Sequence, residues 1–130
     1  MSEGKLSEKV LKTLSHLDAI PVDNPRRPGT PDVNYVEGWL ELKYLPEWPK
    51  RDRTIVTIET WTPKQVIWHM KRSLAGGKTF LLVQVGGDYL LFEGGVASVF
   101  INKVTQQRMR ELAIMVWSEY PGDRLCPYLK

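Results

Sequence analysis

The chain has 130 residues, of which 42% are hydrophobic and 25% charged, and these values suit one soluble globular domain with one core. The net charge of +3 is too small to predict nucleic-acid binding by itself. No apolar run approaches the ~18 residues of a membrane span, and the polar N-terminus lacks the apolar core of a signal peptide. We therefore expect a single cytoplasmic domain over residues 1–130 and no membrane partner.

The first predicted element is an amphipathic helix over residues 2–18. Four apolar side chains recur at intervals of three and four residues, which places them on one face of a helix. They are Leu6, Val10, Leu14 and Leu17. Residues 18–30 contain three prolines and a glycine and predict an ordered loop.

Residues 33–36 and 39–44 predict the two strands of a β-hairpin. The connecting turn contains Gly38, at a position where a two-residue turn requires a positive φ. Side chains alternate between the two faces of a strand. Glu41 and Lys43 are therefore expected side by side, on the face opposite the leucines of the second strand.

Residues 46–53 form a loop rich in proline and basic residues, and the alternation in residues 54–59 predicts a further strand. A helix is expected from Pro63 to residue 74, because Thr62 can cap it and two glycines follow it. Its buried side is expected to consist of its apolar residues Val66, Ile67, Met70 and Leu74.

Residues 79–85 are a nearly continuous apolar run, which suits a strand buried on both faces, and residues 89–92 predict the next strand. Residues 96–101 fit either a helical turn or a strand. Residues 105–120 predict a last helix, followed by an irregular tail. The order αβββαββα predicts an α/β fold with helices around a central mixed sheet, in which strand 79–85 is central and parallel to a hairpin strand.

The cysteine and histidine content restricts the metal chemistry that the chain can support. Cys126 is the only cysteine, which excludes an internal disulfide and a cysteine-based zinc site. The only histidines are His16 and His69, so carboxylates are the expected ligands of a metal ion.

The hairpin brings two carboxylates and a lysine together, as a metal-dependent phosphodiesterase requires. Asp32 precedes the first strand and Glu41 lies on the second. Hydrolysis of a phosphodiester needs a cation that neutralises the transition state and supplies hydroxide, and Mg²⁺ prefers oxygen ligands. Asp32, Glu41 and the carbonyl of Leu42 therefore predict a site for Mg²⁺ or Mn²⁺. Lys43 would orient or deprotonate the attacking water, or stabilise developing charge.

These motifs resemble a known family. Gly29-Thr30-Pro31-Asp32 followed by Glu41-Leu42-Lys43 resembles the signature of the PD-(D/E)xK nuclease superfamily. Thr62-Pro63-x-Gln65-x-x-Trp68 and Ala75-Gly76-Gly77 resemble its VRR-nuc branch, which is similar to Holliday-junction resolvases. The resemblance covers about residues 26–85 and implies a restriction-endonuclease-like core.

The resemblance also implies roles for individual residues. Asp32 and Glu41 would be metal ligands, Lys43 the catalytic lysine, and Gln65 a contact to the active site or the phosphate. The family often adds an acidic residue from the first helix, and both Glu3 and Glu8 remain open for that role. The chain departs from the family in its long loop after Lys43 and in the absence of a separate DNA-binding domain.

We therefore predict a Mg²⁺- or Mn²⁺-dependent DNA endonuclease, selective for branched or junction DNA. The resemblance implies a homodimer, because resolvase-like relatives cut two strands as dimers, and a phage origin with action in the host cytoplasm. Four basic residues flank the predicted site and could neutralise phosphates. They are Arg26, Arg27, Lys50 and Arg51.

Two alternatives remain open. The first is a restriction-like or homing endonuclease with sequence preference, in which the basic loop at residues 46–53 reads DNA. The second is a non-catalytic DNA-binding module of the same fold. The presence of Asp32, Glu41 and Lys43 together favours an enzyme, because a non-catalytic module has no chemical need for all three.

Overall fold

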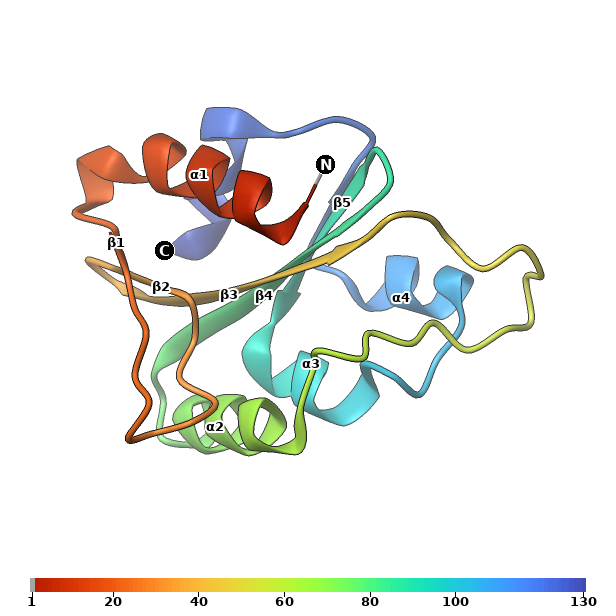
Figure 1. Cartoon of the computed structure of the whole chain (residues 1–130), viewed down its shortest axis with the longest axis horizontal. Helices are drawn as coiled ribbons and strands as arrows, with labels where there is room; N and C mark the ends of the chain where they lie inside the picture. The colour runs from red at the N-terminus through yellow and green to blue at the C-terminus, as the bar shows by residue number, and fades with distance from the viewer. Residues whose placement is uncertain (1) are drawn as a thin grey trace.

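A single six-stranded mixed sheet organises the computed structural model, which describes residues 2–130 (Figure 1). The strands lie in the order β1-β2-β3-β4-β5-β6, and every neighbouring pair is antiparallel except the parallel pair β3 and β4. The strands are β1 (Ile20–Pro21), β2 (Val33–Tyr35), β3 (Gly38–Leu45), β4 (Lys78–Val85), β5 (Asp88–Glu93) and β6 (Met115–Trp117). The predicted α/β class with a mixed sheet is confirmed.

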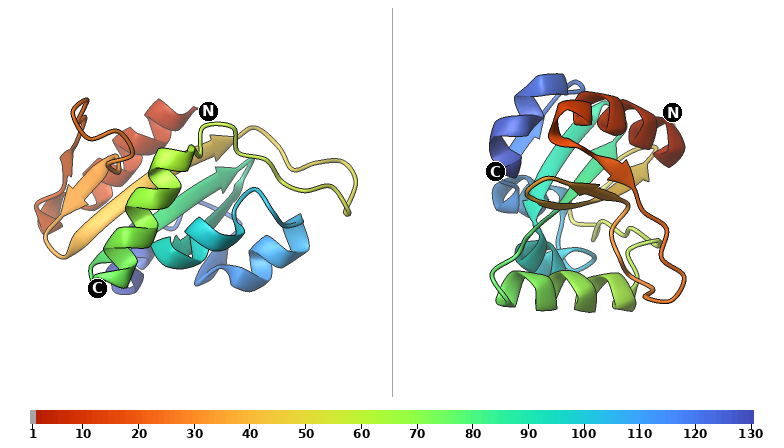
Figure 2. Two further views of the ribbon diagram at one scale, coloured as in Figure 1. Left: turned by 90° about the horizontal axis from the view of Figure 1, so that it is seen from below. Right: turned by 90° about the vertical axis from the view of Figure 1, so that its left-hand side faces the viewer.

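Helices cover both faces of the sheet (Figures 1 and 2). One face carries α1 (Glu3–Thr13), the 3₁₀ helix η1 (Ser15–Leu17) and the 3₁₀ helix η2 (Gly122–Leu129). The other carries α2 (Pro63–Leu74), α3 (Gly94–Phe100) and α4 (Gln106–Leu112). Within residues 2–130, no helix is both long and apolar enough to cross a bilayer.

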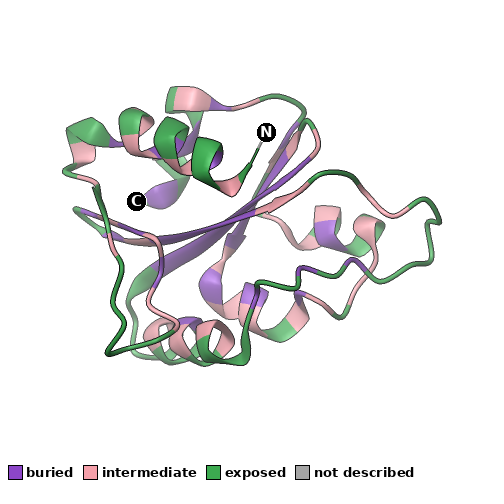
Figure 3. Ribbon diagram, in the orientation of Figure 1, coloured by how far each residue is buried: buried purple, intermediate pink, exposed green. Residues whose placement is uncertain are grey.

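The sheet separates two hydrophobic cores, and β4 contributes to both because its side chains alternate. Leu82 packs toward α1, while Leu81 and Val83 pack toward α3 and α4. Figure 3 shows the buried sheet between helices whose outer surfaces are exposed. The prediction that strand 79–85 is central, buried on both faces and parallel to a hairpin strand is confirmed.

The N-terminal helix is confirmed but is shorter than predicted. The Ser2 side chain accepts a hydrogen bond from the Lys5 amide at 3.2 Å and caps α1. Its apolar stripe is fully buried at Leu6 and Val10. The helix stops at Thr13, and η1 ends at a left-handed Asp18 with φ of 57°.

The hairpin is confirmed, but the predicted role of Gly38 is wrong. Tyr35 pairs with Gly38, so the turn consists of the two residues between them, and Gly38 does not have a positive φ. A Cβ atom at this position would lie 2.3 Å from the carbonyl oxygen of Lys78. Glycine is therefore required for the close approach of β4, not for the turn.

The predicted strand at residues 54–59 is wrong. Apart from a single bridge between Ile55 and Thr105, this segment makes no sheet pairing among the described residues. The Asn102 side chain holds it, accepting from the Ile58 amide at 2.7 Å and donating to the Ile58 carbonyl at 3.1 Å. The alternation reflects burial of Val56 and Ile58 against the second core, so the order αβββαββα does not hold with this strand in it.

The C-terminal part also differs from prediction. Residues 96–101, which the sequence left open, belong to the helix α3. The helix predicted over residues 105–120 ends at Leu112, because Ala113 is extended and the following apolar residues form β6 beside β5. The tail predicted to be irregular forms η2 and packs Leu125 and Leu129 into the core below α1.

The helix α2 and its end at Gly76 are confirmed, and Val66 packs against the second core as predicted, but the rest of the predicted buried side is wrong. Leu74 is 82% exposed and Ile67 46% exposed, whereas His69 is fully buried. The His69 Nδ1 atom and the Thr79 hydroxyl lie 2.9 Å apart in a hydrogen bond, and Trp68 packs edge-on against Trp39. Polar and aromatic contacts, rather than the aliphatic residues, fix the rotation of the helix.

Gly38→Ala should lower the free energy of unfolding by about 2–4 kcal/mol, because the added methyl group meets backbone rather than a flexible side chain. Gly4→Ala is the matched control, since a Cβ atom there has room in α1 and should stabilise the helix by roughly 0.5–1 kcal/mol. Urea denaturation measures both. Equal effects of the two variants would contradict the close-approach explanation.

Candidate active site

Asp32 is held against the end of β3 that extends beyond β2. Its backbone carbonyl accepts a hydrogen bond from the Val22 amide at 2.8 Å. Its Oδ2 atom accepts from the Leu42 amide at 2.9 Å. Because β2 begins only at Val33, the edge of β3 at Leu42 is open to this side chain instead of a strand. The hairpin therefore positions Asp32 beside the Glu-x-Lys motif.

Glu41 and Lys43 lie side by side on the α2 face of β3, as predicted. The Lys43 Nζ atom is 3.4 Å from Glu41 Oε2 and donates a hydrogen bond to the Thr60 carbonyl at 2.7 Å. The two residues are only 1% and 2% exposed. A buried ion pair is thus held between the central sheet and the segment that leads into α2.

The surroundings of Glu41 disfavour the ionised form of its carboxyl. Its pKa is raised to about 9, first by burial and then by the charge of Asp32 and a hydrogen bond with Asp32, against the opposing effect of Lys43. The Oε1 atom of Glu41 is buried without a hydrogen-bond partner among the described residues. A cation next to this oxygen would relieve both conditions.

Of the two acidic residues of α1 that the sequence left open, Glu3 lies near Asp32 and Glu8 does not. A hollow of about 290 Å³ lies beside Asp32, and its lining includes Glu3, Asp32 and Leu42. Burial raises the pKa of the Glu3 carboxyl, Lys43 lowers this pKa and Asp32 raises it, so Glu3 lies within the field of the site. Glu8 is exposed and does not line the hollow.

The oxygen donors at Asp32 fit a hard cation. The amide and carbonyl of one extended residue point to the same edge of a strand. The Leu42 carbonyl therefore faces the side on which the Leu42 amide binds Asp32. Residues 2–130 contain no group of three or more His, Cys, Asp or Glu residues placed to hold a metal. Two carboxylates and one carbonyl suit an ion such as Mg²⁺, which keeps several waters.

Gln65 has a structural role at the start of α2. Its Oε1 atom accepts from the Thr62 amide at 3.1 Å, and the Thr62 hydroxyl accepts from the Gln65 amide at 3.3 Å. This reciprocal capping box accounts for Gln65 without a contact to the carboxylates. The cap fixes the chain two residues after Thr60, whose carbonyl binds Lys43.

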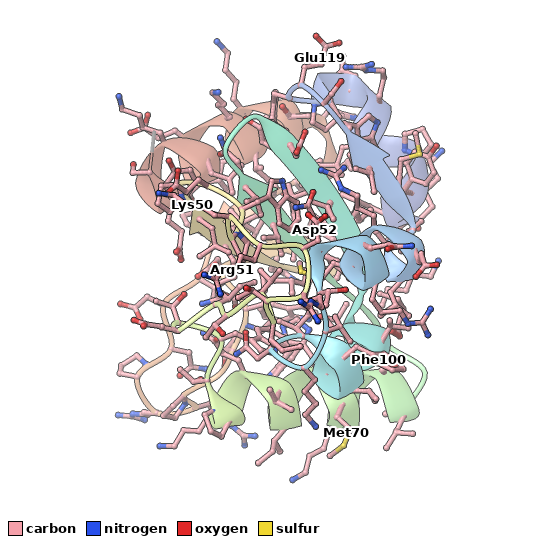
Figure 4. The ribbon with its side chains drawn as sticks, turned by 90° about the vertical axis from the view of Figure 1, so that its right-hand side faces the viewer. Lys50, Arg51, Asp52, Met70, Phe100 and Glu119 are labelled. Carbon is pink, nitrogen blue, oxygen red and sulfur yellow. The ribbon has the colours of Figure 1, made fainter. Side chains whose placement is uncertain are left out.

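The four basic residues predicted to contact DNA lie on two exposed loops. Arg26 and Arg27 lie on the loop before Asp32, and Lys50 and Arg51 lie on the loop between β3 and α2. The second loop projects from the body of the protein (Figure 1), and Figure 4 labels Lys50 and Arg51 on it. None of the four takes part in an ion pair among the described residues.

The projecting loop is anchored by contacts that the sequence did not reveal. The Trp48 indole donates a hydrogen bond to Asp88 Oδ2 at 2.8 Å. Arg110 donates to the same oxygen at 2.8 Å, and its guanidinium lies 5.1 Å from the Trp48 ring centroid. Because these residues come from three distant parts of the chain, no local sequence pattern signals the contact.

His69, to which the sequence assigns no role, is fully buried. Its ring lies between Trp61 and Trp68, at centroid distances of 5.2 and 5.4 Å. Burial, together with the charge of Lys43, lowers the pKa of His69 to about 4. His69 is therefore neutral at physiological pH and supports α2 beside the buried ion pair.

Neither a scan against models of protein families nor a search of curated proteins finds a match to this chain.

Glu41→Gln should raise the melting temperature at pH 8 without divalent metal, and change it little near pH 4.5. The folded protein keeps a proton on Glu41 that the unfolded chain releases between about pH 4.5 and 9, so folding stability falls as pH rises through this window. The variant has no such proton. A gain of ~1 kcal/mol corresponds to roughly 4 °C in a domain of this size.

Thermal unfolding at the two pH values, in EDTA, measures the effect. Glu47→Gln is the matched control, because Glu47 is exposed on the projecting loop. A variant that keeps the wild-type dependence of melting temperature on pH would contradict the assignment of the proton to Glu41.

Proposed function

We propose that the protein is a metal-dependent endonuclease that hydrolyses phosphodiester bonds in DNA. One observation carries the proposal: Asp32 and Glu41 converge at β3 beside Lys43, and Glu41 keeps a buried oxygen without a partner among the described residues. A buried carboxylate beside a half-buried one and a buried lysine is costly for stability. Such an oxygen-rich arrangement would suit the metal ion that phosphodiester hydrolysis uses.

The proposed roles follow from the positions of the side chains. Asp32, Glu41 and the Leu42 carbonyl would hold Mg²⁺ or Mn²⁺, which lowers the pKa of bound water and neutralises phosphate charge. The Lys43 ammonium, held by Glu41 and Thr60, would stabilise negative charge on the phosphate or orient the attacking water. Glu3, on the wall of the hollow, would orient water from the opposite side.

Membership of the PD-(D/E)xK superfamily is part of this proposal. It is supported by the Asp32 position before the hairpin, by Glu41 and Lys43 on the second hairpin strand, and by the α2 crossover to a parallel neighbour. Cutting of branched or junction DNA by a homodimer, as in resolvases, is the form of the activity that we propose first.

A second candidate is an endonuclease with sequence preference. It is favoured by the projecting loop, whose basic tip is exposed while its base is fixed through Trp48 to Asp88 and Arg110. A rigid projection can enter a groove of DNA and contact base edges. Cleavage of a plasmid at a few fixed positions, rather than at a four-way junction, would select this candidate.

Asp32→Asn, Glu41→Gln and Lys43→Ala should each reduce cleavage by about 100-fold or more, because each removes a group that acts on the transition state. Purified protein is incubated with plasmid, single-stranded and four-way-junction DNA, with Mg²⁺, Mn²⁺ or EDTA. Glu47→Gln and Lys103→Ala are exposed controls with matched chemistry. Cleavage that persists in EDTA, or that Lys43→Ala leaves unchanged, would refute the proposal.

Replacing Lys50 and Arg51 together by alanine should weaken DNA binding most at low salt. Each lost phosphate contact lowers the slope of log K against log salt by about 0.9 on duplex DNA, so the pair should lower it by about 1.8. Trp48→Phe removes the indole donor to Asp88 without changing charge. We expect Trp48→Phe to weaken DNA binding in the same titration. An unchanged salt slope in the Lys50 and Arg51 double variant would show that DNA binds elsewhere on the protein.

A further inference from the structure

A second hollow, of about 260 Å³, lies on the outer side of α2 next to the loop that precedes Asp32. It is lined by six residues: Arg27, Pro28, Lys64, Ile67, Trp68 and Lys71. Three of these residues are apolar or aromatic and three are cationic. The term α2 groove refers below to this hollow.

The α2 groove is built from rigid parts. Gly29 has φ of 96°, and a Cβ atom there would lie 2.5 Å from the Lys64 carbonyl oxygen, so the loop rests directly on the first turn of α2. Trp68 is held edge-on to Trp39 at a centroid distance of 5.4 Å. The Arg72 guanidinium lies over the Trp68 ring at 4.5 Å. The aromatic wall is therefore fixed in place.

Apolar side chains that line the α2 groove are exposed to solvent. Ile67 is 46% exposed, and periodicity alone predicted that it would be buried. Exposed aliphatic and aromatic surface next to a hollow marks a binding surface more often than isolated exposed residues do. Trp68 is partly exposed at the same place.

The charge of the groove selects an anionic partner. Arg27, Lys64 and Lys71 supply three cations, and no carboxylate lines the hollow. The helix α2 contains no Asp or Glu in its sequence PKQVIWHMKRSL. None of the three cations takes part in an ion pair within residues 2–130. An anionic polymer with flat apolar faces would match both the three cations of the groove, here called its rim, and its apolar residues, here called its floor.

Single-stranded nucleic acid has this combination of phosphates and unstacked bases, and proteins bind it with cationic grooves and aromatic platforms. A duplex hides its base faces and would leave the floor unused. Pro28 is four residues from Asp32, so it lies within about 14 Å of it along the chain. A strand that occupies the groove can therefore reach Asp32 within a few nucleotides.

We propose that the α2 groove binds the unpaired strand of the substrate, within a few nucleotides of the scissile phosphate. Phosphates contact Lys64, Lys71 and Arg27, and one base packs on Ile67 and Trp68. The placement next to the cleaved bond rests on the proposed nuclease function, whereas single-strand binding itself does not.

The first test compares two double variants in a fluorescence-anisotropy titration with a labelled 12-nucleotide oligothymidylate, in EDTA so that no cleavage occurs. Lys64→Ala with Lys71→Ala should weaken binding at least about tenfold and lower the salt slope by about 1.4, at 0.7 for each single-strand contact. Lys12→Ala with Lys103→Ala removes the same charge from exposed lysines outside the groove. Equal losses in the two double variants would overturn the proposal.

The second test asks whether a base occupies the floor. Wild-type protein should bind the oligothymidylate at least about fivefold more tightly than an abasic oligomer of the same length, because one stacked base contributes about that much. Ile67→Ser should reduce this ratio toward one and leave binding of blunt duplex unchanged. Circular dichroism checks that the variant is folded, as expected for a half-exposed position.

Other occupants give different outcomes. Competition by a polyglutamate peptide as strong as that by the oligothymidylate would assign the groove to acidic peptides. A change of molecular mass in light scattering on Ile67→Ser would assign it to a second copy of the chain. Either result would overturn the proposal.

Loss of cleavage by Asp32→Asn with normal single-strand binding supports both proposals, whereas single-strand binding without any cleavage refutes only the nuclease function.

Discussion

The parallel pairing of β3 with β4 is the constraint on which the rest of the molecule depends. It runs over eight residue pairs, from Gly38 with Lys78 to Leu45 with Val85. Two parallel strands cannot be joined by a tight turn, so the chain must cross over the sheet. The crossover contains the projecting loop and α2, and it covers the face of β3 that carries Glu41 and Lys43. The burial of these two charges is therefore a consequence of topology.

Burial of this kind opposes stability. Two ionisable groups that are nearly inaccessible to water lose hydration, which their mutual attraction only partly replaces. The Thr60 carbonyl compensates for the burial of Lys43, whereas the charge of Asp32 beside Glu41 adds to the cost of burying Glu41. An apolar pair at the same positions would pack in the second core without these requirements. Departures from local stability rules concentrate at sites that perform a function, and Asp32, which lies beside Glu41, also lines the hollow that contains Glu3.

The parts of the fold that sequence could predict are local, and the parts that it could not are set by distant contacts. The hairpin and the adjacency of Glu41 and Lys43 follow from strand alternation. The predicted rotation of α2 was wrong because the hydrogen bond between His69 and Thr79 decides which side of the helix is buried, rather than its aliphatic residues. Residues 54–59 alternate like a strand but meet Asn102 instead of a sheet edge. Thr60 contacts Lys43 through its backbone carbonyl, and Glu3 lies near Asp32 because of how α1 packs. The type of side chain at either position therefore does not predict its place.

The two edges of the sheet restrict how any partner can associate with the protein. β1 has only two residues, one of them Pro21, and β6 has three. A proline has no amide hydrogen to donate, and short edges offer few backbone groups to a strand from another chain. The long apolar strands β3, β4 and β5 lie in the interior of the sheet, and the Asp32 side chain occupies the edge of β3 that β2 leaves open at Leu42. Association by strand addition is therefore disfavoured, and recognition must come from side chains on the helices and loops.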